Sequence, residues 1–395
     1  MALVTETSKL CSMPSNGIKK NEDIYNMFQY SQGKFTTQGH KGIPENHFEE
    51  EQGRQGFFGQ VSHLIKPQPS TRWNHIEGPL KPHLYDLVQL PKSFGVWKRT
   101  VYNSEMGLYK LCLSKSDPAA QKAFRNADGD TLYFVHKGSG QVFTEYGLLN
   151  FKAGSYISIP KCVTHTLFCQ EESDFLVIES RTSMFREPDR GMLGRNAFYD
   201  PAAIGKPNLD LLHVELKKLS APIIEITVKR DDQNTSFGYI ENVYDTVGWK
   251  GDLFPFTLHI SDLMPILSAR VHLPPSVHTT FVAKGFVVCT FLPRPLETDA
   301  DALKVPFYHQ NIDYDEILFY HDGNFFSRDN LHAGMMTFHP AGFPHGPHPK
   351  AMKNVGTKTH TDEVAVMIDS LNHLKIDSQL DSLEVKNYWQ SWMSK

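Results

Sequence analysis

The sequence predicts an all-β protein made of two related, strand-rich blocks. From about residue 100 onward, short runs of Val, Ile, Leu, Phe and Tyr are interrupted every 8 to 10 residues by Gly, Pro, Asn or Asp. Evenly spaced short strands with turn residues between them are typical of antiparallel sandwiches and barrels. Two ordered motifs also recur in both halves of this region. The 395 residues suffice for two ordinary domains whose cores need no disulfides.

The N-terminal segment differs in composition from the rest of the chain. Residues 1–97 are rich in Gly, Pro, Gln, Asn and His and carry an acidic run at 49–51. We expect an irregular segment with short strands here. The N-terminus lacks the basic start and apolar stretch of a signal peptide, and no window reaches the roughly 18 apolar residues of a membrane span. We therefore expect a cytoplasmic protein with no membrane partner.

The remaining elements follow from local patterns. Strands are expected at 131–138, 141–147, 148–154, 155–160, 165–169 and 174–180. A helix is expected at 209–219, strand patterns return from 223 to 369, and apolar spacing at 380–392 predicts a short C-terminal helix. We therefore divide the chain into the irregular segment 1–97, a first β-block at 98–208 and a second at 209–395.

Charge and cysteine content restrict the partners. Lys and Arg number 40 against 44 Asp and Glu, and no basic run is present, so nucleic acid is not expected as a partner. The five cysteines are scattered without a C-x-x-C pair, which indicates reduced thiols. Histidine is the unusual residue, because eight of the 19 lie between His272 and His348.

The two β-blocks share an internal repeat. GSYISIPKCVTH begins at Gly154 and GMMTFHPAGFPH begins at Gly334, with glycine, proline and histidine at the same spacing. Upstream of each, DTLYFVHKG ends at Gly138 and DEILFYHDG ends at Gly323. Two motifs repeated in the same order indicate a duplicated unit.

The repeated unit resembles the double signature of the cupin family. Gly334, Pro340, Gly342 and His345 match the second cupin motif in full. His309, Asn311 and Glu316 match the first motif, with Asn311 in place of its usual second histidine and Gly323 at the expected distance after Glu316. The resemblance implies a bicupin, with two jelly-roll β-barrels in one chain.

Only the second block carries a full set of metal ligands. His309, Glu316 and His345 supply two imidazoles and one carboxylate, the arrangement found in non-haem Fe(II) oxygenases, although zinc sites also use this set. Alignment of the first block places Phe124, Asn126 and Thr131 at the positions of His309, Asn311 and Glu316. His165 is then alone in its block and is expected to be a hydrogen-bonded structural residue.

Two neighbouring residues leave alternatives open. Asp315 could replace Glu316 as a ligand, but adjacent strand residues face opposite ways, so only one points inward, and the glycine spacing favours Glu316. His339 lies six residues before His345, so it either supports the ligands or is packed beside them. The remaining nearby histidines are expected to have surface or supporting roles: His278, His321, His332 and His348.

Longer segments resemble the homogentisate 1,2-dioxygenase family. The matching stretches are NADGDTLYFVHKG, TEYG, GWKGDLFPF, HLPPSV, FYHQN, FPHGP and NYWQSW, spread in order from about residue 100 to the C-terminus. The resemblance implies an iron enzyme that opens the ring of homogentisate with O2 to give maleylacetoacetate. It further implies that His309, Glu316 and His345 hold Fe(II), that His339 and His345 face the substrate, and that His272 is the general base.

The resemblance also implies a homo-oligomer, a trimer or hexamer, with a small aromatic acid and O2 as the binding partners. His272 could alternatively be a capped histidine before the Pro274-Pro275 turn. Gln310 stands where the family usually has Arg, and Phe325 where Tyr is common, so we expect both positions to contact the substrate and to affect its identity. Two alternative functions remain open. The protein could cleave the ring of a related acid such as gentisate, or it could be a zinc-bound bicupin that acts as an isomerase or a binding protein.

Overall fold

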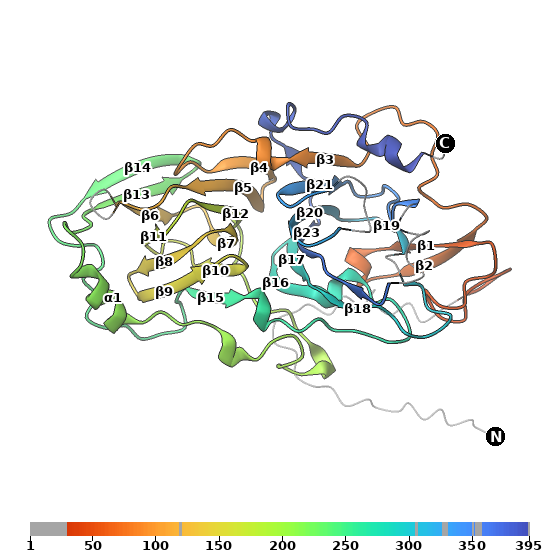
Figure 1. Ribbon diagram of the computed structural model, residues 1–395, viewed down its shortest axis with the longest axis horizontal. Coiled ribbons are helices and arrows are strands. Elements are labelled where there is room, and N and C mark those ends of the chain that lie inside the picture. The colour runs from red at the N-terminus through yellow and green to blue at the C-terminus, as the bar shows by residue number, and fades with distance from the viewer. Residues whose placement is uncertain are drawn as a thin grey trace, which may run out of the picture.

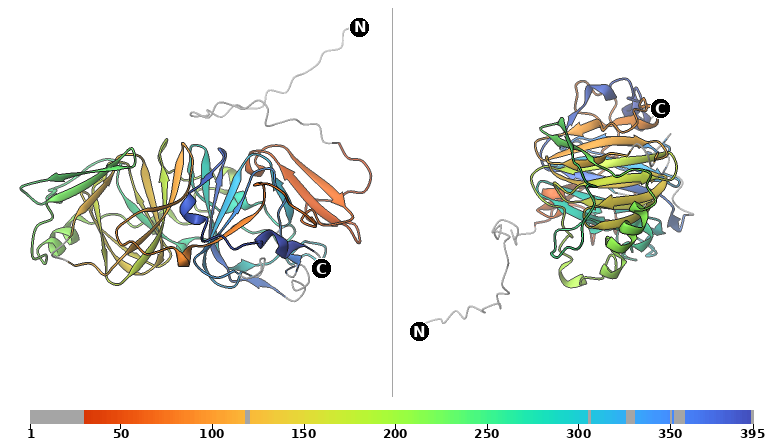
Figure 2. Two further views of the ribbon diagram at one scale, coloured as in Figure 1. Left: turned by 90° about the horizontal axis from the view of Figure 1, so that it is seen from above. Right: turned by 90° about the vertical axis from the view of Figure 1, so that its left-hand side faces the viewer.

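The computed structural model describes residues 30–117, 121–304, 307–325, 331–349, 351 and 358–393. Two β-barrels lie end to end along the long axis of the molecule (Figure 1), and the left view of Figure 2 shows the same elongated arrangement from above. The all-β, bicupin fold class predicted from the sequence is confirmed. Within the described residues, no helix is long and apolar enough to span a membrane.

The first barrel consists of two sheets. One has the strand order β15-β10-β7-β12-β5-β4-β24 and the other β14-β13-β6-β11-β8-β9. The strands are β4 (Lys98–Tyr102), β5 (Met106–Leu113), β6 (Ala123–Asn126), β7 (Asp130–Lys137), β8 (Ser139–Thr144), β9 (Gly147–Lys152), β10 (Ser155–Ile159), β11 (His165–Cys169), β12 (Ser173–Ser180), β13 (Glu225–Arg230), β14 (Gln233–Gly238), β15 (Phe256–His259) and β24 (Lys375–Ile376).

The second barrel contains a six-stranded sheet in the order β16-β17-β23-β20-β21-β3 and a three-stranded sheet in the order β19-β1-β2. The strands are β1 (Phe48–Gly53), β2 (Val61–Lys66), β3 (His83–Asp86), β16 (Thr279–Ala283), β17 (Phe286–Phe291), β19 (Tyr308–Asn311), β20 (Asp315–Asp322), β21 (Met335–His339) and β23 (Val364–Ser370). The short strands β18 (Arg294–Pro295) and β22 (His360–Thr361) form a separate pair.

The chain crosses between the barrels, which the proposed boundaries at 97 and 208 do not allow for. Strands β1 to β3 come from the segment expected to be irregular, yet they complete the second barrel. Strands β13 to β15 follow residue 208 and complete the first. Strand order depends on pairing between distant segments, and β1 pairs in parallel with β19 about 260 residues later, which local patterns cannot reveal.

The core explains why the central strands are apolar along their whole length. Tyr133 and Val135 of β7 point into the first barrel, whereas Leu132 and Phe134 pack between the barrels against residues such as Phe319 of the second. Both faces of β7 are therefore buried, and its sequence does not alternate with polar residues.

The helices agree with the expected positions but are short. Helix α1 (Leu209–Leu216) lies inside the predicted range 209–219, and the Asn208 side chain caps it by accepting from the Leu211 N–H. Residues 388–392 form a 3-10 helix, Tyr388–Trp392, inside the predicted C-terminal range. The described cysteines are free thiols, as expected, whereas Cys11 lies outside the described residues.

Candidate metal centre

Three side chains from different strands and loops converge inside the second barrel. His309 lies on β19, Glu316 on β20, and His345 in the loop after β21. Their ligand atoms all lie within 4.8 Å of one another, and all three residues are buried. The backbones of His309 and His345 are joined by two reciprocal N–H to C=O hydrogen bonds of 2.8 Å. The sequence prediction that these residues meet is therefore correct in geometry.

The two histidine rings are oriented by backbone carbonyls. The Nδ1–H of His309 donates to the Phe307 carbonyl at 2.8 Å, and that of His345 donates to the Phe343 carbonyl at 3.1 Å. This fixes the tautomer in which Nε2 carries a lone pair. The Nε2 atom of His345 is buried without a hydrogen bond, 3.5 Å from Glu316 Oε2. A bare imidazole nitrogen beside a carboxylate is suited to a divalent metal ion.

Glu316 is held in its ionised form. Burial alone would raise its pKa, but His345 and His339 hold the pKa of Glu316 well below its ordinary value. His339 faces Glu316 across the β20–β21 pair, and its Nδ1–H donates to Glu316 Oε1 at 2.6 Å. The ring of His339 also stacks on that of His345, with centroids 4.6 Å apart. His339 therefore supports the carboxylate and one imidazole of the centre.

Asp315 faces away from the centre. Its carboxylate accepts the backbone N–H of Ala341 and that of Leu374, each at 2.7 Å. Adjacent strand residues point to opposite faces, so the inward direction belongs to Glu316. The open choice between the two carboxylates is thus resolved in favour of Glu316 as the residue beside the histidines.

His272 lines the same cavity as His309 and Glu316. Its Nδ1–H donates to Glu297 at 3.0 Å, which leaves Nε2 as the proton acceptor. Burial lowers the pKa of His272, although the Glu297 carboxylate opposes this shift. A neutral histidine held by a carboxylate is the arrangement that a general base needs.

Two of the expected substrate contacts do not line this cavity. Gln310 follows His309 on β19 and faces the other way, where its amide donates to the Gly342 carbonyl at 2.7 Å. Phe325 packs in an apolar cluster with Tyr320, at a centroid distance of 4.8 Å, beside the C-terminal segment. Neither Gln310 nor Phe325 lines this cavity, and their contact with the substrate stays a prediction.

The cavity contains residues that the sequence did not identify. Arg294 is 9% exposed and lines the cavity with His309. His278, expected at the surface or in a supporting role, is buried in the same wall, and its Nδ1 has no hydrogen-bond partner. The signal that could have found Arg294 is its position in FLPRPLE, because a charged residue among apolar residues and prolines is unusual.

The first barrel shows how the same site looks without ligands. Phe124 pairs with His165 there, as His309 pairs with His345 in the second barrel. His165 Nε2 accepts from the Tyr133 hydroxyl at 2.8 Å, so its nitrogen is already satisfied. Among the described residues, the two groups able to hold a metal ion both lie outside this barrel. The prediction that His165 is a structural residue agrees with these contacts.

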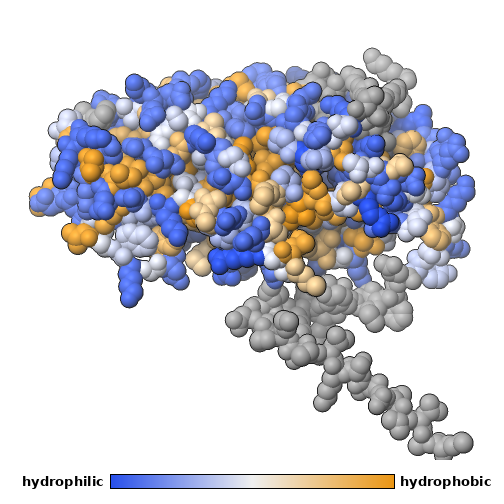
Figure 3. Space-filling view, turned by 60° about the horizontal axis from the view of Figure 1, so that its bottom comes forward, coloured by the Kyte–Doolittle hydropathy of each residue, from blue (hydrophilic) through white to orange (hydrophobic). Residues whose placement is uncertain are grey.

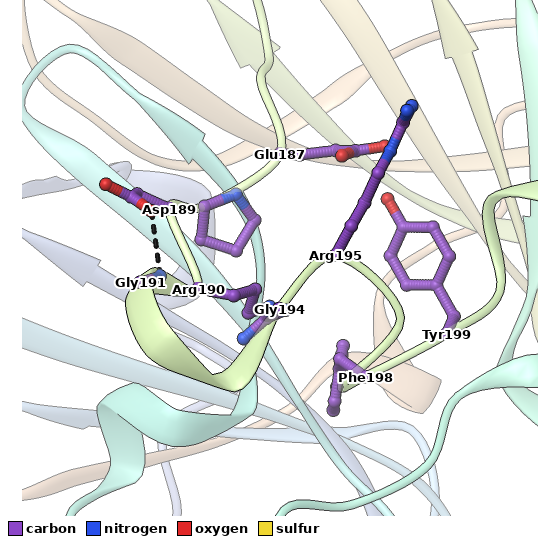
Figure 4. A pocket seen from close by; sticks show the side chains of 9 residues that line it. Glu187, Asp189, Arg190, Gly191, Gly194, Arg195, Phe198 and Tyr199 are labelled. Carbon is purple, nitrogen blue, oxygen red and sulfur yellow. Dashed lines mark hydrogen bonds between the residues drawn. The ribbon is translucent and has the colours of Figure 1, made fainter.

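Two larger hollows lie away from these ligands. The mouth of the first barrel forms a cavity of about 750 Å³ lined by His165, Tyr133 and Lys229 among others. A second hollow of about 320 Å³ lies in the segment 187–199, where Figure 4 shows Glu187, Arg195 and Tyr199 around it. No histidine lines that second hollow, so size alone does not mark the candidate centre.

Two barrels, one of which brings two histidines and a glutamate together, define a bicupin with a candidate metal centre in its second barrel. A family model described as "Homogentisate 1,2-dioxygenase N-terminal" matches residues 42–260. This match covers more than half of the chain, and the chain therefore belongs to the homogentisate 1,2-dioxygenase family.

Individual relatives agree with this membership. "Putative dioxygenase SSO1533" of Saccharolobus solfataricus is 31% identical over 370 residues, which cover 87% of this chain and 92% of that protein. Homogentisate 1,2-dioxygenase of Drosophila melanogaster is 26% identical over 58% of this chain and 53% of its own length. The human homogentisate 1,2-dioxygenase is 26% identical over 48% of this chain and 43% of its length. The matches thus span about half of these two enzymes.

Among solved structures, a Cupin 2 conserved barrel domain protein from Leptotrichia buccalis is 11% identical, with a TM-score of 0.32. That match covers 73% of this chain and 96% of the other. The fold assignment given above depends on the strand order of this protein and not on that similarity.

Proposed function

We propose that this protein is an Fe(II)-dependent dioxygenase that cleaves the aromatic ring of homogentisate with O2 to give maleylacetoacetate. The observation that carries the proposal is the buried convergence of His309, Glu316 and His345, with imidazole Nδ1 atoms held by backbone carbonyls. Bound iron would supply redox chemistry and open positions for substrate and dioxygen. Family membership supports oxygenase chemistry at this centre.

The residues of the cavity have distinct proposed tasks. His272 accepts the proton of a ring hydroxyl at Nε2, while Glu297 holds the opposite ring nitrogen. Arg294 binds the carboxylate of the substrate, taking the task that sequence reasoning gave to position 310. Leu318, Met367 and other apolar residues of the wall exclude water. The cavity measures about 70 Å³, so a ring substrate has to displace part of this wall on binding.

The substrate is tested with protein loaded anaerobically with Fe(II). Oxygen uptake is measured with homogentisate, gentisate and a catechol acid at equal concentrations, and the homogentisate rate is expected to be the highest. Uptake with gentisate and none with homogentisate would assign the protein to the related ring-cleaving reaction. Metal analysis compares the wild-type protein with His345→Ala. We expect His345→Ala to lose iron. Loss of zinc alone, together with no activity of the wild-type protein after iron loading, would favour the isomerase or binding function.

We also propose that the protein is a homo-oligomer, a trimer or a hexamer. Figure 3 shows apolar side chains gathered at several places between charged ones on one face of the molecule. Exposed large apolar residues of the described chain include Met184, Met192, Leu193, Met264 and Leu267. Exposed apolar surface of this kind often marks a contact between subunits. Light scattering coupled to gel filtration measures the assembly, and a monomer at micromolar concentration would contradict the proposal.

A further inference from the structure

A second group of histidine and glutamate side chains lies in the N-terminal strands. His40 precedes β1, Glu49 and Glu51 lie two residues apart on β1, and His63 lies opposite Glu51 on β2. Potential ligand atoms of His40, Glu49 and His63 lie within 4.8 Å of one another. This group is separate from the centre described above and has no part in the proposed ring cleavage.

The contacts inside the group are short, and only the one between His40 Nδ1 and Glu49 Oε2 has the geometry of a hydrogen bond. His40 Nδ1 lies 3.0 Å from Glu49 Oε2, and His63 Nδ1 lies 3.1 Å from Glu49 Oε1. His40 Nε2 lies 2.8 Å from Glu51 Oε2. Yet His63 Nδ1 and Glu51 Oε2 are buried and make no hydrogen bond. Buried nitrogen and oxygen atoms that converge with only one hydrogen bond among them are suited to act as ligands around a shared ion.

Charge gives a second, independent reason. Glu49 is 2% exposed and Glu51 is 5% exposed, so two carboxylates are buried side by side. The ion-pair partners of these carboxylates are His40 and His63. Lys66, the nearest lysine on β2, pairs with Glu50 on the opposite face of β1. Buried carboxylates need compensating charge, and one divalent cation would neutralise both.

The surroundings hold the group in place. The backbone N–H of His40 donates to Glu49 Oε2 at 2.8 Å, and the Thr36 hydroxyl donates to Glu49 Oε1 at 3.1 Å. Gly39 leaves room for the His63 ring, because a Cβ at Gly39 would lie 2.7 Å from His63 Cε1. The His40 ring stacks on Phe307 at a centroid distance of 3.9 Å.

We infer that His40, Glu49 and His63 form a second metal site, which binds a zinc ion. His40 Nδ1, the Glu49 carboxylate and His63 Nδ1 are the ligands, a set typical of zinc. Glu51 Oε2 lies 2.8 Å from His40 Nε2, so this carboxylate stands behind the ring and leaves Nδ1 to the ion, as carboxylates behind metal-bound histidines do. The site joins β1 and β2 to the segment before β1.

The test uses full-length protein that is stripped of metal with a chelator and then loaded with zinc, and it measures the zinc that stays bound. The His345→Ala variant is the background, because this substitution removes a ligand of the first centre. We expect one zinc per chain in that background and none in His345→Ala with His63→Ala. His75→Ala is the matched control, since His75 is an exposed histidine on the same segment with a side chain that is 71% exposed; it should keep the zinc. Glu51→Gln should weaken zinc binding by roughly 10- to 100-fold.

Cobalt(II) provides a direct spectroscopic readout, because a site with two imidazoles and a carboxylate gives visible absorption when cobalt replaces zinc.

Absence of zinc in the His345→Ala background, or unchanged zinc in the double variant, would overturn the second site. If His345→Ala does not fold, the comparison is made between wild type, with two metals, and His63→Ala, with one; equal contents would overturn it. Neither result depends on dioxygenase activity, so failure of the proposed function is seen separately in the oxygen assay.

Discussion

His345 and His165 occupy equivalent positions in the repeat, yet their Nε2 atoms have different surroundings. In the first barrel the Tyr133 hydroxyl satisfies His165, and burial lowers the pKa of His165 to about 4. In the second barrel the Nε2 atom of His345 faces Glu316 without a hydrogen bond. In the second barrel His309 and Glu316 lie beside His345, as a metal site would need, whereas the shared motif alone does not supply such partners.

The sequence identified these candidate ligands but not all of their surroundings. Glycine spacing selected Glu316 over Asp315, and strand alternation explains why this choice agrees with the structure. Gln310 was assigned to the substrate because of its place in a family motif, although the same alternation turns it away from His309. Arg294 belongs to no motif, so only the fold brings it to the cavity.

We expect protonation of His272 to determine how activity falls on the acid side of the pH profile. The pKa of His272 is lowered below its ordinary value near 6.5, so the base remains neutral until the pH falls below that value. His272→Asn should reduce kcat by about 100- to 10,000-fold. Glu297→Gln removes the negative charge that raises the pKa of His272, so the acid limb of kcat/KM should move to lower pH. An unchanged pH profile in Glu297→Gln would contradict this assignment.

Arg294 should determine how strongly the carboxylate binds. A charge-assisted hydrogen bond contributes about 1.5–3 kcal/mol, so Arg294→Gln is expected to raise KM for homogentisate by roughly 10- to 100-fold. Oxygen uptake with a hydroquinone that lacks the acid group should change much less. Arg270→Gln serves as the control because the Arg270 side chain is 70% exposed. Equal loss on both substrates would show that Arg294 acts on the fold and not on the carboxylate.

At the scale of elements, the repeated hairpins explain why the motif glycines recur. Gly138 and Gly323 end equivalent strands with φ values of +94° and +95°, a region that other residues rarely adopt. A Cβ at Gly323 would also lie 2.0 Å from the Asp362 carbonyl oxygen. The glycine therefore allows the end of β20 to lie close to the chain that enters β23.

Gly323→Ala should lower the free energy of unfolding by about 3 kcal/mol, because backbone strain and a close contact add together. Gly95→Ala is the matched control: Gly95 has a φ of +75°, but nothing lies within 4 Å of its added Cβ. The control should lose only about 1 kcal/mol. Urea unfolding measures both values, and equal losses would mean that the contact with Asp362 does not contribute.

Strand β1 shows the limit of local sequence patterns. Its sequence FEEEQG has no alternation of apolar and polar residues and therefore does not predict a strand. In the structure, however, β1 lies between β2 and β19. Glu49 and Glu51 can be buried because their carboxylates pair with His63 and His40. In contrast, strands such as β7 and β10 were predictable, because both of their faces pack on apolar neighbours.

At the scale of the whole molecule, the two barrels meet at equivalent residues. His136 of the first barrel and His321 of the second lie with their Nδ1 atoms 3.0 Å apart in the buried interface. Burial lowers the pKa of both histidines, and that of His321 falls to about 4. Lys110 and Lys137 act on His136 in the same direction, and His259 does so on His321, whereas Asp322 opposes the shift of His321.

Acid should therefore loosen the contact between the barrels. The folded pKa of His321 is below the unfolded value, so its contribution to stability is complete above pH 6.5 and is lost as the pH falls toward 4. Between pH 7 and 4.5 this loss amounts to about 2–3 kcal/mol. His321→Gln should lose less stability over the same range when calorimetry compares it with wild type. Identical acid sensitivity of the two proteins would contradict the role of this pair.

The central claim is that iron at His309, Glu316 and His345 supports oxygen-dependent cleavage of homogentisate. The most direct test is oxygen consumption by the Fe(II)-loaded protein with homogentisate, measured beside His309→Ala under the same conditions. We expect one O2 consumed for each homogentisate that disappears in the wild-type protein, with maleylacetoacetate as the product, and no uptake above background in His309→Ala. Absence of uptake by iron-loaded wild-type protein, or equal uptake by both proteins, would contradict the claim.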